Sequence, residues 1–174
     1  METILVALIV SLKFILPALM LRAPFYGLWA NYFLDIVDGD ILMQLGIADS
    51  MYQTIDKSAD LVSYVFMLIL GWRWRIRRTI AVLFAYRFIG QILFFITHDE
   101  KVFLYFQNFL EPLMLIYVVI IFKQKSEEKA YAVYKKYIFL IWGGILAYKF
   151  WNEWYLHYAN IDLSLLIFGF TGGK

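Results

Sequence analysis

The segment TILVALIVSLKFILPALML, residues 3–21, contains a single charged side chain, Lys13. An apolar stretch of this length is sufficient for a helix that crosses a bilayer. It is too long for the core of a signal peptide, no basic region precedes it, and no clear small-residue cleavage site follows it. We therefore expect a retained transmembrane helix over residues 3–22, with a kink at Pro17.

The composition of the whole chain agrees with a lipid environment. Of its 174 residues 63% are hydrophobic, and 17% are charged, whereas about a quarter are charged in a typical soluble domain. There is no cysteine, which excludes disulfides, thiolate catalysis and cysteine metal sites. The length accommodates about six helices of roughly 20 residues. We predict an all-α, multi-pass integral membrane protein, with residues 1–174 forming one transmembrane helical domain of about six helices.

Alternating apolar runs and polar connections place five further helices after the first. Pro24 suits the first turn of the second helix. Polar connections are expected at residues 47–55, 98–101 and 123–136. The five helices are predicted at residues 24–46, 56–72, 79–97, 102–122 and 137–158.

Basic residues predict an orientation for these helices. They concentrate in two connections, after the third and the fifth predicted helix: Arg73, Arg75, Arg77, Arg78, Lys123, Lys125, Lys129, Lys135 and Lys136. Short loops rich in lysine and arginine stay on the cytoplasmic side of a membrane. The connection at residues 47–55 is therefore expected on the opposite side.

Six of the eight aspartates lie between residues 35 and 60. Asp35 and Asp38 are three residues apart, and Asp56 and Asp60 are four apart, so each pair shares one face of a helix. Ionised groups inside a bilayer are costly and usually mark a functional site. Four carboxylates brought together require cations between them, and oxygen ligands suit Mg²⁺, Mn²⁺ or Ca²⁺. Gly39 allows a substrate or a backbone to approach the first pair closely.

The spacing of these residues resembles a known signature. The segment DIVDGDILMQLGIADSMYQTIDKSAD, residues 35–60, is similar to the motif D-x2-D-G-x2-A-R-x8-G-x3-D-x3-D of the CDP-alcohol phosphotransferases. The four aspartates and Gly39 fall in register. The Ala-Arg pair of the motif is replaced by Leu42 and Met43, and its second glycine by Tyr52.

The resemblance implies a six-helix membrane enzyme of phospholipid biosynthesis that depends on two divalent ions, Mg²⁺ or Mn²⁺. Asp35, Asp38 and Asp56 would hold the ions that clamp the diphosphate of a CDP-linked donor. Asp60 would complete the metal site and act as the general base on an acceptor hydroxyl. The alkoxide would attack the phosphorus distal to the cytidine, and CMP would leave. A membrane lipid and a CDP-linked donor are the expected binding partners.

Other polar residues lie within predicted helices. Arg87 and Glu111 are expected at similar depth in the membrane. They could form an ion pair that joins two helices, or Arg87 could bind a substrate phosphate. Gln91 and Gln107 are candidates for a hydrogen bond between helices. Lys149 forms an i, i+4 pattern with Glu153 and is a further candidate for substrate binding, together with Gly39 and Arg87.

Several alternatives stay open at the level of sequence. Lys13 could neutralise the carboxylates or extend to the membrane surface. The chain could be a cation-binding, transport or scaffold protein, a pseudoenzyme, or a protein whose aspartates lie in a solvated loop. His98 and His157 are too far apart in the pattern for a paired haem site. No motif supports nucleic-acid binding, and a homodimer is compatible with the sequence.

Overall fold

The computed structural model describes residues 2–157, with side chains up to Trp151. The prediction of an all-α protein is confirmed, because residues 2–157 contain no strand. The elements are α1 (Glu2–Ile15), the 3₁₀ helix η1 (Leu16–Leu21), α2 (Pro24–Gln44), α3 (Asp49–Gly71), α4 (Arg77–Thr97), α5 (Val102–Tyr105), α6 (Leu110–Gln124), α7 (Glu127–Lys136) and α8 (Ile138–His157).

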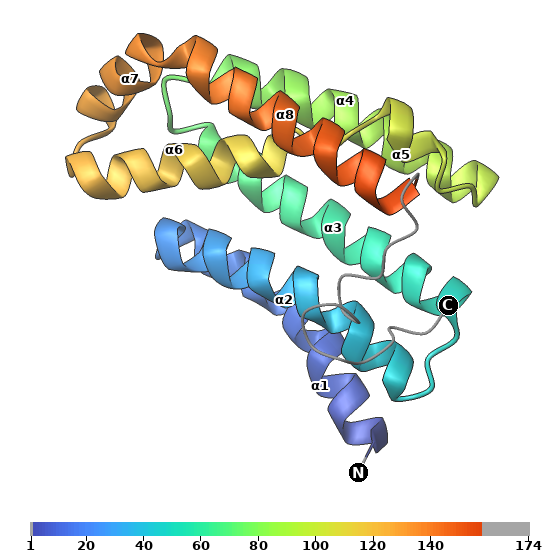
Figure 1. The fold of residues 1–174 in the computed structure, drawn as a ribbon. Coiled ribbons are helices and arrows are strands. Elements are labelled where there is room, and N and C mark those ends of the chain that lie inside the picture. The colour runs from blue at the N-terminus through green and yellow to red at the C-terminus, as the bar shows by residue number, and fades with distance from the viewer. Residues whose placement is uncertain (1, 158–174) are drawn as a thin grey trace.

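The long helices run back and forth across the molecule (Figure 1). α1 and α2 form a hairpin that packs on α3, and α6 contacts α2, α4 and α8. The hairpin is tight because Gly27 has no side chain: a Cβ there would overlap the backbone of Met20. The apolar core lies where η1, α2, α3 and α6 meet, around Met67 and Tyr117. This packing fixes α1, α2 and α3 relative to one another.

Two predicted boundaries of the polar segments were wrong. α3 begins at Asp49 rather than Asp56, so most of the predicted connection at residues 47–55 is helical. The polar residues of this segment lie on exposed or half-buried faces of the helix, where they need no loop. The predicted loop at residues 123–136 contains α7, whose first turn is capped by the Ser126 side chain accepting from the Lys129 amide.

The predicted helix at residues 102–122 is broken. α5 ends at Tyr105 and α6 begins at Leu110. The carbonyl groups freed at the break accept hydrogen bonds from neighbouring side chains. Tyr86 donates to the Tyr105 carbonyl, and Arg87 donates through Nη1 to the Phe106 carbonyl at 2.6 Å. The break is therefore compatible with a stable fold, because these two backbone carbonyl groups have hydrogen-bond donors.

Two helical stretches among the described residues are long and apolar enough to cross a membrane, Glu2–Leu21 and Arg77–Thr97. The other long helices differ from them for identifiable reasons. α2 and α3 carry the aspartates, and α6 has 15 residues, about 22 Å of helix against the roughly 30 Å of a hydrocarbon core.

Candidate metal centre

The aspartates converge where α1, α2 and α3 meet. Asp35 and Asp38 face α3 from α2, while Asp56 faces α2 from α3. One carboxylate oxygen from each of the three lies within 4.8 Å of the other two. Asp38 is fully buried and Asp56 is 7% exposed. Two unit charges at this separation repel by about 3.5 kcal/mol at an effective dielectric constant of 20, so the cluster requires cations.

Lys13 supplies one of these cations from α1. Its ammonium lies 2.5 Å from Asp56 Oδ1 and 3.4 Å from Asp35 Oδ1, and it also pairs with Asp38 Oδ2. The lysine side chain is only 4% exposed. Of the two roles considered for Lys13, neutralisation of the carboxylates is therefore the one adopted. The ammonium occupies the point on which the three carboxylates converge.

Lys57 supplies a second cation between the two aspartates of α3. Its ammonium lies 2.5 Å from Asp56 Oδ2 and 3.9 Å from Asp60 Oδ2. Arg87, on α4, supplies a third cation, and its Nη2 lies 4.0 Å from Asp60 Oδ2. Three cationic side chains thus face four carboxylates, which leaves one formal negative charge in the network.

The network continues from Asp60 to the broken helix. The Tyr64 hydroxyl donates to Asp60 Oδ2 at 3.2 Å and accepts from Asn108 Nδ2 at 3.1 Å. Asn108 also donates to Glu111 Oε2 at 3.1 Å, and its Oδ1 accepts from the Glu111 amide. Arg87 donates through Nε to the Tyr64 hydroxyl at 3.4 Å. Arg87 and Glu111 are therefore joined through Tyr64 and Asn108 and not by the direct ion pair that the sequence suggested.

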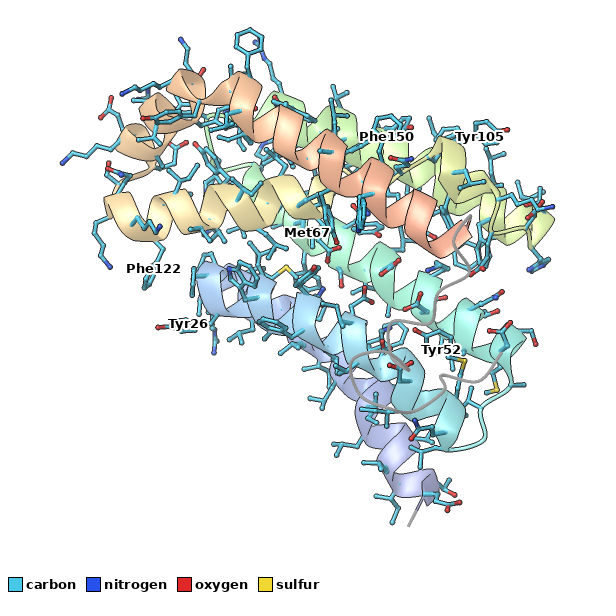
Figure 2. The ribbon with its side chains drawn as sticks, viewed as in Figure 1. Tyr26, Tyr52, Met67, Tyr105, Phe122 and Phe150 are labelled. Atoms are coloured by element: carbon cyan, nitrogen blue, oxygen red, sulfur yellow. The ribbon has the colours of Figure 1, made fainter. Side chains whose placement is uncertain are left out.

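Gly39 follows Asp38 on α2, and the side chain of Tyr52 fills the space over Gly39. A Cβ on Gly39 would be 2.6 Å from the Tyr52 hydroxyl oxygen. The Tyr52 ring is also 5.8 Å from the Lys13 ammonium. Figure 2 places Tyr52 at the junction of α2 and α3. The tyrosine that replaces a motif glycine thus occupies the surface that Gly39 would otherwise expose.

The donor set of the cluster fits a divalent ion. Two oxygens on opposite sides of Mg²⁺ are about 4.2 Å apart, and around Ca²⁺ about 5 Å apart. The span of 4.8 Å in Asp35, Asp38 and Asp56 lies between these values. Asp38 Oδ1 is buried without a hydrogen-bond donor among the described residues, which is the condition of a ligand atom that lacks its partner. An ion could bind here if the Lys13 ammonium moved away.

Two cavities are lined in part by residues of α2, and the first of them adjoins the cluster. The first has a volume of about 10 Å³ and is lined by Lys13, Asn31, Leu34, Asp35, Ala59, Asp60 and Ser63. It has room for about one water molecule, so a substrate could enter only after side chains move. The second is an apolar groove of about 400 Å³ between α2, α6 and α8, in which Trp29, Tyr32, Ile116 and Tyr148 line the wall.

The structure brings most of the predicted site residues together. Asp35, Asp38 and Asp56 share one cluster, Asp60 and Arg87 adjoin it, and Gly39 borders it. The remaining candidate, Lys149, is buried on α8. Its partner in the predicted i, i+4 pattern, Glu153, lies outside the described side chains.

Other sequence predictions had different outcomes. The hydrogen bond between Gln91 and Gln107 is absent, because both amide atoms of Gln91 and Oε1 of Gln107 lack partners among the described residues. His98 lies in a turn with a positive φ of 52°, and the His157 side chain lies outside the description.

Sequence reasoning missed three members of the network. Lys57 follows Asp56 directly in the segment DKSAD, and Tyr64 lies four residues after Asp60 on one helical face. Both signals were present in the sequence. Asn108 was assigned to the middle of a helix, and its role became visible only with the break before α6.

Comparison of the chain with protein-family models, with curated proteins and with solved structures finds no match.

Proposed function

We propose that the chain is a divergent CDP-alcohol phosphotransferase-like membrane enzyme, which transfers a phospho-alcohol group to a hydroxyl acceptor with the help of divalent ions. The observation that carries the proposal is the convergence of Asp35, Asp38 and Asp56 within 4.8 Å, with Asp60 adjacent. A hydrophobic bundle gains no stability from burying four carboxylates at one point, and a metal-dependent reaction supplies a reason to keep them.

The proposal includes six membrane spans. Besides Glu2–Leu21 and Arg77–Thr97, α2 and α3 have 21 and 23 residues, about 32 and 35 Å. α5 and α6 together, and α8, complete the set. Large apolar side chains are exposed over α1, α2, α4 and α8, including Leu8, Phe33, Val82 and Phe139. Lipid would cover these side chains, and the charges would face the interior of the bundle.

In this proposal each site residue has a role. Asp35, Asp38, Asp56 and Asp60 hold two Mg²⁺ or Mn²⁺ ions, which when bound neutralise charge that develops on the transferred phosphoryl group. Lys13 and Lys57 leave the ion positions and become available to phosphate oxygens. Gly39, Arg87 and Lys149 contact the substrate, and Arg87 offers a guanidinium suited to a phosphate.

The transfer itself is a displacement at phosphorus. Asp60 accepts the proton of the acceptor hydroxyl, and the hydroxyl oxygen forms a new bond to the phosphorus of the donor. The bridging P–O bond of the donor diphosphate breaks, and the electron pair leaves with the departing phosphate monoester. For a CDP-linked donor that monoester is CMP.

A second candidate is a non-enzymatic membrane protein of the same fold. The observation that favours it is the pairing of Lys13, Lys57 and Arg87 with the carboxylates, which already neutralises three of the four negative charges. In that case the network joins α1, α2 and α3, and no ion is needed. The replacement of the motif arginine by Met43 and of the motif glycine by Tyr52 agrees with lost activity.

The two candidates differ in their response to metal. In the enzyme, Mn²⁺ raises the thermal unfolding temperature of the purified protein, and Asp56→Asn removes this response. Asp49→Asn is the matched control, because Asp49 is an exposed aspartate on the same helix. If wild type shows no response to Mn²⁺ and forms no CMP from a CDP-linked lipid and an alcohol acceptor, the second candidate replaces the first.

A further inference from the structure

Most lysines and arginines of the described structure lie at one end of the helix bundle, and few lie at the other end. Ten of the chain's 16 lysines and arginines lie in three segments, which are the residues after η1, the residues from the end of α3 to the first turn of α4, and the residues from the end of α6 to the end of α7: Arg22, Arg73, Arg75, Arg77, Arg78, Lys123, Lys125, Lys129, Lys135 and Lys136. The connections at the other end, after α2 and α4, contain Lys101 as their one basic residue, beside Asp99 and Glu100.

Contacts between the connections show that the basic segments lie together. Arg75, between α3 and α4, bonds through Nη2 to Glu128 of α7 at 3.0 Å. The ring of Phe25, at the start of α2, stacks on Phe122 near the end of α6 at 4.3 Å. Figure 2 places Phe122 and Tyr26 at the same end of the bundle, opposite Tyr52. The basic end is thus one surface.

The acidic cluster lies nearer the other end. On α3, Asp56 is seven residues from the start at Asp49 and 15 residues from the end at Gly71. These separations correspond to about 10 Å and about 22 Å along the helix. On α2, Asp38 is six residues from the end at Gln44, or about 9 Å. A substrate therefore has its shortest path from the end that has Lys101 as its one basic residue among these connections.

We propose that this site opens on the extracytoplasmic face of the membrane and takes a phosphate-bearing lipid in place of a soluble nucleotide. The inference rests on the proposed function, because it concerns the substrate of the same site. Basic connections remain in the cytoplasm, which assigns the opposite end to the extracytoplasmic side. Soluble nucleotide-linked donors are cytoplasmic compounds and do not reach that side, whereas lipids of the outer leaflet do.

The apolar groove provides a route for such a lipid. It is open to the side of the bundle, and Tyr32 in its wall lies one helical turn before Asp35 on α2. Its volume of about 400 Å³ is in the range of ligand sites. An acyl chain in the groove would contact Tyr32 on α2, and Asp35, one helical turn further on, lines the small polar cavity together with Lys13.

The first arm of the test determines the orientation. The chain contains no cysteine, so single cysteines can be introduced without a background signal. Ser50→Cys places a thiol at the acidic end, and Lys129→Cys is the matched control at the basic end; both residues are exposed. With a membrane-impermeant maleimide, we expect labelling of Ser50→Cys in intact cells and of Lys129→Cys only after permeabilisation. The reverse pattern overturns the proposal.

The second arm determines the ligand class. Protein in dodecyl maltoside micelles, which contain no phosphate, is compared with protein in the same micelles with added phosphatidic acid, and with protein given soluble CDP. Higher thermal stability with phosphatidic acid, absent in Arg87→Gln, supports a lipid substrate. A response to CDP alone, or to neither compound, overturns it. Neither arm depends on the Mn²⁺ response, so a failure here is distinguishable from failure of the metal site.

Discussion

Replacement of Lys13 by methionine is the sharpest test of the idea that the lysine ammonium and a metal ion compete for one position. Lys13→Met shortens the unbranched side chain by one atom and removes its charge. The variant leaves three carboxylates whose oxygens lie within 4.8 Å of one another. Removal of one partner from a buried ion pair costs about 3–5 kcal/mol, so in the presence of a chelator we expect a fall in unfolding temperature on the order of 10 °C.

The same variant should bind Mn²⁺ more tightly than wild type. In wild type the ion must displace an ammonium that lies 2.5 Å from Asp56, and this displacement costs about the same 3–5 kcal/mol. Because 1.4 kcal/mol corresponds to a tenfold change in affinity, the variant should bind Mn²⁺ roughly a hundredfold to several thousandfold more tightly. At an Mn²⁺ concentration of 100 times Kd, binding restores about 2.7 kcal/mol of stability.

Two measurements test the predicted changes in stability and in Mn²⁺ affinity. Tryptophan fluorescence in detergent reports unfolding, since the chain has six tryptophans, and electron paramagnetic resonance reports free Mn²⁺. The double variant Lys13→Met, Asp56→Asn is the control and should lose the rescue. Equal Mn²⁺ affinity in wild type and Lys13→Met, or a Lys13→Met protein that stays as stable as wild type in chelator, refutes the reasoning.

Two further changes test the surroundings of the cluster by thermal unfolding. Gly39→Ala should destabilise the wild-type protein, because the added Cβ would meet the Tyr52 hydroxyl at 2.6 Å. In a Tyr52→Ala background the same change should stabilise the protein by about 1 kcal/mol, because alanine has the higher helix propensity. A destabilisation in that background would contradict the contact between Gly39 and Tyr52. Asn108→Ala should cost about 2–3 kcal/mol, since Tyr64 and Glu111 lose their partner, whereas a loss under 0.5 kcal/mol would mean that the hydrogen bonds at the break contribute little.

The shared helical face of Asp35 and Asp38, and that of Asp56 and Asp60, followed from sequence, because the spacing within each helix fixes the face of each side chain. The position of Lys13 could not be predicted from the sequence. It depends on the depth and rotation of α1, which are set by the close contact of Gly27 with the Met20 backbone. Such a contact between distant residues leaves no periodic pattern in the sequence.

The sequence before α6 contains a helix-start pattern, but the apolar character of the surrounding residues favoured one continuous helix. The segment NFLEP, residues 108–112, has asparagine followed three residues later by glutamate, and then proline in the first turn of the helix, a pattern typical of helix starts. The apolar run from residue 102 to 122 favoured a single span instead. Hydropathy reports which solvent a segment prefers, and it does not report whether the backbone within that segment is continuous.

The position of Arg87 has a consequence for how this protein can change over time. An interrupted helix in hydrocarbon exposes carbonyl groups that no water can satisfy, and one fork of this guanidinium repairs the interruption while another faces Asp60. One side chain thus supports the fold and also faces the proposed site. A relative without the proposed reaction would still need this arginine for its fold, so the presence of the arginine in a relative would not by itself indicate catalysis.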